Sequence, residues 1–291
     1  MANQSVCAIV VTYHPGVQVL EHLGRVLSQT QAMVVVDNGS EPNEVALLHT
    51  ARQDLGFHLI ENEQNLGIAE ALNQGVRWAK DQRYPWVVLF DQDSGITDGF
   101  IRQMFEAWES HSNHDRVGSI HPRYVNPETG IEPVVRRASD GGPIISLTSG
   151  ALMPTRVFDE VGWFASEYFV DEVDTEYCYR LRASGYLIAD SKLAVLFHKA
   201  GHPKKHTILG FSFLPMHHNA VRRYYLSRNR IALYKKYFRR FPLWIFQSFQ
   251  VDLRETIKCF IGERDRVHKF RNFLLGTWDG FSGRMGKRQD I

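Results

Sequence analysis

The stretch VVLFDQDS, residues 87–94, passes from four apolar residues directly into two carboxylates, Asp91 and Asp93, which are separated by one residue. A continuous apolar run of this kind is typical of a strand that is covered on both faces, as in a parallel sheet. Open α/β folds bind their ligands at the carboxyl ends of such strands. The stretch therefore predicts a parallel sheet that delivers two carboxylates to a binding site.

Strand and helix patterns alternate on the N-terminal side of this stretch. Short apolar, β-branched runs predict strands, and apolar residues at helical spacing predict helices. The expected strands are residues 7–12, 33–36, 57–60 and 87–90, and the expected helices between them are residues 17–29, 43–53 and 68–80. Repeated β/α units imply a mostly parallel sheet with right-handed crossovers and flanking helices. The predicted fold class is therefore α/β and Rossmann-like.

Two later segments extend this pattern. Residues 144–153 (IISLTSGALM) predict a further strand with a loop of small residues. From Asp171 the pattern is helical, and Gly185 is the expected stop. Asp171 and Asp174 are three residues apart, so we expect them on one face of the first helical turn. Capping alone explains one Asp at a helix start, but DEVDTE holds four acids in six residues, which favours a general base presented there.

The charge of the chain is unevenly distributed. The 291 residues carry a net charge of +2, with 44% apolar and 23% charged residues, which is typical of a globular protein. Residues 222–291 hold 17 Lys and Arg against 6 Asp and Glu, or +11, whereas residues 1–221 hold 17 against 26, or −9. We therefore expect a catalytic domain over residues 1–221 and a basic, aromatic-rich helical region over residues 222–291. The basic region is expected to meet an anionic partner, and a solvated basic face is the alternative.

The cysteines and the apolar segments indicate a location. Cys7, Cys178 and Cys259 lack the spacing of disulfides or metal sites, which favours a reducing, cytoplasmic compartment. The N-terminus lacks the basic and apolar segments of a signal peptide. The apolar cluster at residues 241–249 is far shorter than the roughly 20 residues that a spanning helix needs. We expect a soluble protein, or one attached peripherally to the inner face of the cytoplasmic membrane.

Polar or turn-forming residues follow each of the four expected strands, with the sequences TYHP, DNGS, NEQNLG and DQD. Any one of these loops is a good turn and no more. Because the carboxyl ends of parallel strands meet at one edge of a sheet, the four together describe a crevice of the kind that binds nucleotides. The chain has neither GxGxxG after the first strand nor GxxxxGK[ST], which disfavours dinucleotide and P-loop sites.

A divalent cation can hold phosphates without a glycine-rich loop. One or two carboxylates bind Mg²⁺ or Mn²⁺, and phosphate oxygens take the remaining positions. In an extended DQDS segment, Asp91 and Asp93 point to one side and Gln92 to the other. The two carboxylates repel each other unless a cation lies near them. Asp91 and Asp93 are therefore candidate ligands of Mg²⁺ or Mn²⁺, and a solvated turn is the alternative because DxD is a common tripeptide.

Several segments, taken in order, resemble the inverting glycosyltransferases of family 2, which have the GT-A fold. They are VVTYHP, VVVDNGS, NEQNLGIAEALNQGVRWA, VVLFDQDS, LTSGALMP, FVDEVDTEYCYRLRASGY and LFHKAGHP. Within this family, FVDEVDTEYCYR and the later RRYYLSRNR are similar to bacterial rhamnosyltransferases that build surface polysaccharides such as O-antigen. The resemblance implies a GT-A fold with a C-terminal helical extension. It also implies transfer of a sugar, most specifically L-rhamnose from dTDP-β-L-rhamnose, to a hydroxyl of a glycan or lipid-linked glycan acceptor.

The resemblance assigns donor and metal contacts residue by residue. The implied donor-binding residues are Thr12, Tyr13, Asp37, Asn65, Gly67, Asp91, Gln92, Asp93 and Arg228. Asp37 would reach the base or ribose of the nucleotide. Asp91 and Asp93 match the metal-binding DxD, with Asp93 favoured as the direct ligand, and the cofactor would be Mg²⁺ or Mn²⁺. His198 matches a histidine that supplies a further metal contact, although a lone His is structural by default and Mg²⁺ prefers oxygen.

The resemblance also implies a carboxylate base among Asp171, Glu172 and Asp174. The wider family commonly reads Glu-Asp-Val-Asp with the second acid as base, whereas this chain reads Asp-Glu-Val-Asp. The familiar position falls on Glu172, but rhamnosyltransferase-like sequences keep an acid more clearly at the position of Asp171. We favour Asp171, then Glu172, with Asp174 in support. Only one carboxylate within reach of the acceptor hydroxyl is required.

The C-terminal region combines arginines with aromatic residues. Guanidinium groups within residues 222–230, Arg228 among them, suit donor or acceptor phosphates. Residues 234–246 interleave basic and aromatic side chains, which suits the headgroup zone of an anionic membrane. A helical tail that packs on the body or on a second subunit, as in a homo-oligomer, is the alternative. No recognisable nucleic-acid-binding module accompanies the region, so nucleic acid is not an expected partner.

Other classes of protein stay open as alternatives. A nucleotidyltransferase would normally carry a Gly-rich loop with Arg or Lys directly after the first strand, and VVTYHPG has neither Arg nor Lys. A non-catalytic sugar-binding relative would lose the carboxylates that this chain keeps. A family 2 transferase that uses another UDP-, dTDP- or GDP-sugar is the alternative to the rhamnose interpretation.

Overall fold

The computed structural model describes residues 4–198, 206–208, 211–213, 219–262 and 265–291. The chain forms two compact units. Unit 1 comprises Met1–Ser166 and Val173–His198, and unit 2 comprises Glu167–Glu172 and Lys199–Ile291. The boundary predicted after residue 221 falls inside a helix of unit 2, α7 (Ala220–Tyr237).

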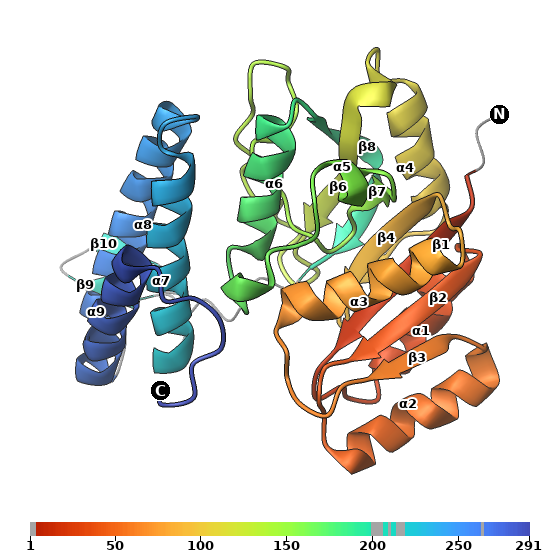
Figure 1. Cartoon of the computed structure of the whole chain (residues 1–291), viewed down its shortest axis with the longest axis horizontal. Helices are drawn as coiled ribbons and strands as arrows, with labels where there is room; N and C mark the ends of the chain where they lie inside the picture. The colour runs from red at the N-terminus through yellow and green to blue at the C-terminus, as the bar shows by residue number, and fades with distance from the viewer. Residues whose placement is uncertain (1–3, 199–205, 209–210, 214–218, 263–264) are drawn as a thin grey trace. The chain divides into compact units, whose positions relative to one another are not determined.

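Unit 1 is built on an eight-stranded mixed sheet of order β3-β2-β1-β4-β7-β6-β8-β5 (Figure 1). The strands are β1 (Val6–Thr12), β2 (Ala32–Asp37), β3 (His58–Glu61), β4 (Trp86–Asp91), β5 (Gly95–Ile96), β6 (Val117–Val125), β7 (Leu152–Pro154) and β8 (Leu187–Phe197). The neighbours β3, β2, β1 and β4 are parallel, as the sequence predicts. In the second half, β7 is antiparallel to β4 and β6, and β5 is antiparallel to β8.

Helices cover both faces of this sheet. They are α1 (Val19–Leu27), α2 (Pro42–Leu55), α3 (Ile68–Asp81), α4 (Phe100–Glu109), α5 (Val157–Glu160) and α6 (Val173–Ala183), with short 3₁₀ turns at His114–Arg116 and Ser166–Tyr168. Alternate strand residues such as Val10, Val35 and Val88 form one core with α1, α2 and α4, because side chains alternate across a strand. Ile9 points the other way and contacts α3, where a Cβ at Gly75 would lie 2.4 Å from its methyl group.

Residues 144–153 are predicted to form a strand and a loop of small residues; the loop is present, but the strand is wrong for most of its length, because only Leu152–Pro154 is a strand. Gly150 has a φ of +81°, which breaks an extended run. Its amide donates to the carbonyl of Leu89 at 2.6 Å, so this loop is tied to β4 by single hydrogen bonds. The remaining predicted strands and helices of the first half are confirmed to within a few residues.

Unit 2 is mainly helical, which confirms the predicted C-terminal helical extension. Its elements are α7, α8 (Pro242–Gly262), α9 (Arg266–Ser282) and the hairpin strands β9 (His206–Ile208) and β10 (Phe211–Phe213). α7 packs against α9 and also contacts α8, and Figure 1 shows the three helices side by side. Among the residues that the structure describes, no helix has the length and apolarity required to cross a bilayer.

Candidate functional site

The loop after β2 is organised by the carboxylate of Asp37. Thr12 and Asp37 are register partners at the ends of β1 and β2, and both are buried. The carboxylate accepts hydrogen bonds from Thr12 Oγ1 (2.9 Å), Ser40 Oγ (2.6 Å) and the Ser40 amide (2.9 Å). Gly39 has a φ of +84°, and a Cβ there would lie 2.4 Å from the backbone of Gln64, so only glycine fits between these loops. The two predicted donor residues therefore lie together at the sheet edge.

Asn38 connects the loops after β2 and β3, a role that the sequence patterns above do not predict. Its side-chain oxygen accepts from the Leu66 amide (3.0 Å) and from Asn62 Nδ2 (3.3 Å). Its side-chain nitrogen donates to Asn65 Oδ1 (3.2 Å), which also accepts from the Gly67 amide (2.8 Å). The predicted donor residues Asn65 and Gly67 are thereby fixed to the loop of Asp37. The asparagine of DNGS is the sequence feature that could have indicated this link between the loops, since a buried side-chain amide must be hydrogen-bonded.

Gln92 joins the loops after β1 and β4. Its side-chain oxygen accepts from the Tyr13 amide (2.9 Å), and its side-chain nitrogen donates to the Tyr13 carbonyl (3.1 Å). Tyr13 as a whole residue is 43% exposed. Both residues were predicted to bind the donor, and the structure places Gln92 so that it holds the backbone of Tyr13 in position.

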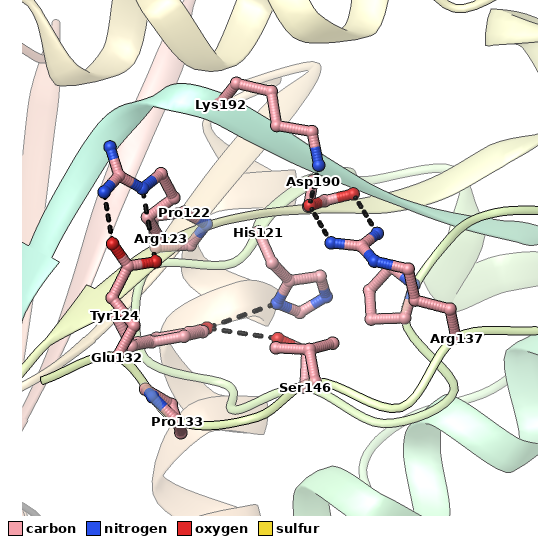
Figure 2. Close-up of a pocket in the computed structure, with 12 residues that line it drawn as sticks. His121, Pro122, Arg123, Tyr124, Glu132, Pro133, Arg137, Ser146, Asp190 and Lys192 are labelled. Atoms are coloured by element: carbon pink, nitrogen blue, oxygen red, sulfur yellow. Dashed lines mark hydrogen bonds and ion pairs between the residues drawn. The ribbon is translucent and has the colours of Figure 1, made fainter.

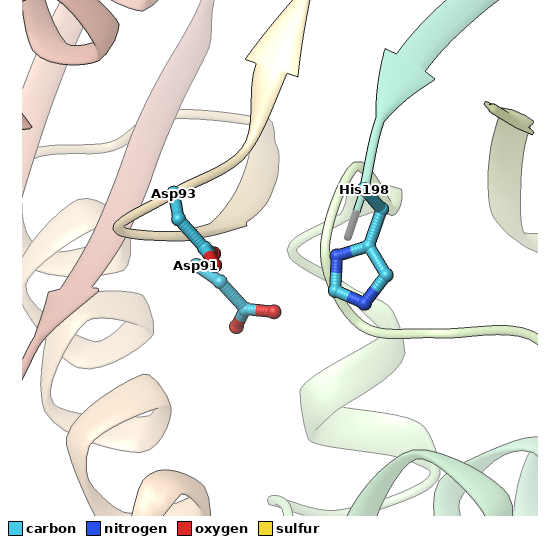
Figure 3. A group of neighbouring side chains, drawn as sticks. All are labelled: Asp91, Asp93 and His198. Carbon is cyan, nitrogen blue, oxygen red and sulfur yellow. The ribbon is translucent and has the colours of Figure 1, made fainter. Parts of the chain in front are cut away.

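Asp91, Asp93 and His198 form a candidate metal centre (Figure 3). One ligand atom from each residue lies within 4.8 Å of those of the other two. Asp91 ends β4, and His198 follows β8, where its amide donates to the Val125 carbonyl at 3.0 Å. The Nδ1 atom of His198 is buried and has no hydrogen-bond partner among the described residues. Two carboxylates and an unpaired imidazole nitrogen suit a divalent cation, so the residues fit the predicted Mg²⁺ or Mn²⁺.

Ionisation of Asp91 is less favourable in the metal-free protein than in an exposed Asp. Burial raises the pKa of Asp91 from 3.8 to about 6; the charge of His198 opposes this rise, and the carboxylate of Asp93 adds to it. A bound cation stabilises the ionised form and so reverses the effect. Metal binding at this group is therefore expected to be linked to pH and to stability.

This linkage gives a testable result. Between about pH 4 and pH 6 the unfolded chain has released the Asp91 proton while the folded protein keeps it, so rising pH lowers the free energy of unfolding, by about 2–3 kcal/mol for this residue. The Asp91→Asn variant cannot ionise here, so its free energy of unfolding is expected to fall less between these pH values. Urea unfolding of chelator-treated protein at pH 4 and pH 7 measures the difference.

The matched measurement adds MnCl₂ at pH 7. It is expected to raise the Tm of the native sequence and to leave that of Asp91→Asn nearly unchanged, because the variant lacks one ligand. Identical pH dependence in the two proteins, together with equal responses to Mn²⁺, would contradict the proposed linkage.

The candidate base residues Asp171 and Glu172 lie outside helix α6, which begins at Val173. Their φ angles are +60° and +62°, in the left-handed region, so they cannot continue a right-handed helix. The prediction that Asp171 and Asp174 share one face of a first helical turn is therefore wrong. Asp174 lies in unit 1, where its carboxylate accepts from the Thr175 amide at 2.8 Å, whereas Asp171 and Glu172 lie in unit 2.

Arginines of α7 pair with both acids. Arg222 Nε lies 3.1 and 3.0 Å from the two carboxylate oxygens of Asp171, and Arg222 Nη2 lies 2.7 Å from Oδ1. Arg230 Nε donates to Glu172 at 3.0 Å, and its Nη2 lies 3.1 Å from Asp252 of α8. Burial alone would lower the pKa of Arg230, but these two carboxylates raise it, so the guanidinium stays charged. Arg222 and Arg230, two of the arginines predicted to meet phosphates, thus have carboxylate partners in their own unit.

Arg228 and Asn229 hold the backbone of residues 167–172, the acidic loop that contains Asp171 and Glu172. Asn229 Nδ2 donates to the carbonyls of Tyr168 (2.9 Å), Val170 (2.7 Å) and Asp171 (3.0 Å). Arg228 is 1% exposed and donates to the carbonyls of residues 167 and 168 and of Gly286. Left-handed conformations of non-glycine residues persist only where surrounding contacts impose them. The predicted role of Arg228 in donor binding stays a prediction, and the structure gives it the role of a loop clamp.

A second concave region of unit 1 contains none of the predicted site residues (Figure 2). The cavity measures about 170 Å³ and lies along β6 and β8. Arg137 and Lys192 both pair with Asp190, at 2.8 Å each, and Arg123 pairs with Glu132. Burial lowers the pKa of His121 to about 4, so this ring is neutral at pH 7. The cationic side chains that line the cavity already have carboxylate partners. The cavity is therefore a poorer phosphate site than the sheet edge that carries Asp91 and Asp93.

Comparison with known proteins defines the class. Residues 7–146 match the family model described as glycosyl transferase family 2. Two solved structures are similar over 96% of this chain: TarS of S. aureus (TM-score 0.64, 13% identity, 49% of that chain) and the mannosyltransferase PcManGT of Pyrobaculum calidifontis, in complex with GDP-Man and Mn²⁺ (TM-score 0.59, 15% identity, 87% of that chain). Residues 7–146 therefore resemble family 2 glycosyltransferases, and the chain is a glycosyltransferase with the GT-A fold.

Curated relatives narrow this assignment. The chain is 28% identical over 302 residues to the dTDP-rhamnosyl transferase RfbF of Shigella flexneri, and the alignment covers 98% of each chain. It is 20% identical over 211 residues to the poly-β-1,6-N-acetyl-D-glucosamine synthase of Staphylococcus aureus, which covers 66% of this chain and about half (49%) of that protein. The resemblance to bacterial rhamnosyltransferases is thus confirmed as a similarity along almost the whole chain.

Proposed function

We propose that the protein transfers L-rhamnose from dTDP-β-L-rhamnose to a hydroxyl of a glycan, with inversion at the anomeric carbon. The observation that carries this proposal is the likeness to a dTDP-rhamnosyl transferase over 98% of both chains, the C-terminal helices included. The group of Asp91, Asp93 and His198 supports it, because it is suited to a cation that binds a diphosphate. A proposal with another donor sugar would account less directly for this full-length similarity to a dTDP-rhamnosyl transferase.

The sheet edge provides the donor contacts in this proposal. Thr12, Tyr13 and Asp37 hold the nucleoside, and Asn65 and Gly67 line the same crevice. Gln92 contributes by fixing the backbone of Tyr13. Hydrogen bonds tie Thr12 to Asp37, Gly67 to Asn65 and Tyr13 to Gln92, so little ordering of these loops is needed when the donor binds.

Asp91, Asp93 and His198 would hold Mg²⁺ or Mn²⁺. When bound, such a cation neutralises charge on the departing nucleoside diphosphate. Asp93 is the more exposed of the two carboxylates, which is consistent with a direct contact to a cation shared with the donor. Asp91, which is partly buried, has a raised pKa, and a positive charge beside it favours its ionised form.

Asp171 acts as the general base in this proposal. The acceptor oxygen bonds to C1 of the sugar from the face opposite the diphosphate, the bond from C1 to the diphosphate oxygen breaks, and the acceptor proton passes to the carboxylate. Each carboxylate oxygen has two lone pairs, so the contacts with Arg222 leave capacity for one acceptor hydroxyl. Glu172 is the second candidate, and Asp174 would act only in support. The product is an α-L-rhamnoside, and no covalent enzyme intermediate forms.

A donor screen tests the proposed sugar. Purified protein with MnCl₂ is mixed with dTDP-rhamnose, dTDP-glucose, UDP-N-acetylglucosamine or GDP-mannose, and release of the nucleoside diphosphate is measured with and without a glycan acceptor. We expect turnover of dTDP-rhamnose to exceed that of the other donors by at least about tenfold, since the lost contacts of a wrong sugar cost 1–3 kcal/mol or more.

The outcomes separate two levels of the proposal. Turnover of another donor with dTDP-rhamnose ignored would overturn the sugar and leave the transferase intact. A donor that is hydrolysed equally in the presence and absence of every acceptor would count against transfer itself. Nuclear magnetic resonance of the product reports the anomeric configuration and therefore tests inversion.

We further infer that the acceptor is a lipid-linked glycan of a surface polysaccharide, met at the inner face of the cytoplasmic membrane. The charge of +11 on residues 222–291 supports this inference, because anionic lipids attract basic segments.

A further inference from the structure

Helix α9 has an inverted distribution of side chains. Its buried positions are Lys269, Gly276, Asp279 and Gly280. Its exposed positions include every third or fourth residue in a row of large apolar side chains: Val267 (81% exposed), Phe270 (50%), Leu274 (50%), Trp278 (67%) and Phe281 (60%). A surface helix normally buries its apolar stripe and exposes its polar face. The apolar face of α9 is therefore turned away from the packed side of the helix, and at least half of each of these residues is exposed.

The packing of α9 on α7 fixes this orientation. A Cβ at Gly276 would lie 2.2 Å from the Tyr224 carbonyl oxygen, and a Cβ at Gly280 would lie 2.6 Å from the Arg228 carbonyl oxygen. Only a helix face of glycines can approach another backbone this closely. Asp279 adds a hydrogen bond from the Tyr224 hydroxyl at 2.7 Å. Rotation of α9 about its axis would break these contacts, so the apolar row is turned outward by the fold itself.

Helix α8 presents a second row of the same kind. Asp252 faces α7, where it pairs with Arg230 and accepts from the Tyr234 hydroxyl, and Ile245 is 3% exposed on the packed side. The outward row consists of Leu243, Phe246, Leu253 and Ile257, each 48–74% exposed, and Phe249, at its edge, is 48% exposed and contacts the ring of Tyr234 in α7. With Val251, the two helices carry 11 of the 20 exposed large apolar side chains found in the described residues. So large a share on two helices marks an interaction surface rather than scattered surface residues.

The basic charge of unit 2 selects the partner. Exposed arginines flank both rows, at positions 239, 240, 254, 266, 271 and 284. Two copies of this chain would bring two +11 regions together, whereas an anionic bilayer offers both the apolar depth and the opposite charge. The rows run along helices of 17 and 21 residues, or about 26 and 32 Å, which suits helices that lie in the plane of an interface.

We propose that the outward rows of α8 and α9 form a docking surface for anionic lipid. This inference deepens the proposed lipid-linked acceptor by naming the surface, and it does not depend on the identity of the sugar. The surface overlaps the segment for which the sequence predicts membrane contact, residues 234–246, because Leu243 and Phe246 belong to the outward row of α8. Tyr237 and Ile245 of that segment are 5% and 3% exposed, so they belong to the packed interior of unit 2.

Vesicle sedimentation of the full chain tests the surface. Vesicles of phosphatidylcholine alone and of phosphatidylcholine with an equal part of phosphatidylglycerol are compared at low salt. The native sequence is expected to sediment with the anionic vesicles. The double variant Leu274→Glu/Trp278→Glu is expected to bind at least about tenfold more weakly, because two carboxylates replace apolar groups at the interface. The matched control Val17→Glu/Leu193→Glu changes equally exposed residues of unit 1 and is expected to bind like the native sequence.

A second measurement avoids reliance on charged variants. Brominated lipids quench tryptophan that enters the bilayer, so the native sequence is expected to lose fluorescence that the Trp278→Phe variant does not lose. Circular dichroism checks that all variants fold.

Three results would overturn the proposal. The native sequence could stay in the supernatant with anionic vesicles at low salt, or the α9 variant and the unit 1 control could bind alike. Sedimentation velocity without vesicles could instead show a dimer that Leu274→Glu/Trp278→Glu dissociates, which would assign the surface to a second copy. Nucleoside diphosphate release without vesicles is measured in parallel, so a failure of the transferase is distinguished from a failure of the docking surface.

Discussion

Replacement of Asp171 by Asn is expected to lower the rate of sugar transfer about 10³-fold, within the range that general bases contribute. The amide keeps the size of the carboxylate but cannot take the proton of the acceptor hydroxyl. Donor affinity is expected to stay within about twofold, since the loss falls on the chemical step. Steady-state kinetics of transfer and calorimetric titration of dTDP-rhamnose measure the two quantities separately.

The neighbouring acids provide the controls for Asp171. Glu172→Gln and Asp174→Asn remove one carboxylate each and are expected to cost less than Asp171→Asn. If Asp171→Asn stays active and Glu172→Gln does not, Glu172 is the base. Loss of activity in all three variants with loss of donor affinity would indicate damage to the loop rather than loss of a proton acceptor.

Replacement of Asp93 by Ala is expected to abolish metal-dependent turnover, with a loss of about 10³-fold or more, because several kcal/mol of stabilisation of the leaving diphosphate disappear. Asp93 supplies one of the three candidate ligand atoms that lie within 4.8 Å of one another. Binding of Mn²⁺, followed by electron paramagnetic resonance, is expected to weaken in parallel with turnover.

Asp98→Ala is the matched control for Asp93→Ala. Asp98 is an exposed aspartate in the same segment and lies outside the candidate metal centre. Its replacement is expected to leave turnover and Mn²⁺ binding unchanged. An active Asp93→Ala enzyme that still requires the metal would move the cation to other ligands.

The first half of the fold could be predicted from local sequence patterns. The apolar runs of β1, β2 and β4 are buried on both faces, so their composition alone marks them as central parallel strands. The second half could not, because β7 has three residues and is fixed by its pairing with β4 and β6 rather than by its own composition. Pairing between segments far apart in the chain leaves little signal in a short segment.

The candidate metal centre and the acidic loop also differ in how far they could be predicted from the sequence. Asp91, Asp93 and His198 could be named from motifs, and the structure brings them together. The partners of Asp171 and Glu172 could not, because a sequence shows that Arg222 and Arg230 are cationic but not which anion they meet. The left-handed backbone of these acids was also hidden, since neither residue is glycine. The side chain of Asn229, fifty-eight positions after Asp171, imposes it.

The clamp formed by Arg228 and Asn229 makes the catalytic loop dependent on the C-terminal helices. The family model ends at residue 146, and unit 1 ends at His198, yet the loop with the favoured base takes its hydrogen bonds from α7. A fragment cut after the sheet would keep the cation ligands and lose the scaffold of the base. Exchange of C-terminal regions between relatives would therefore transplant the catalytic loop's geometry along with any change in acceptor or membrane preference.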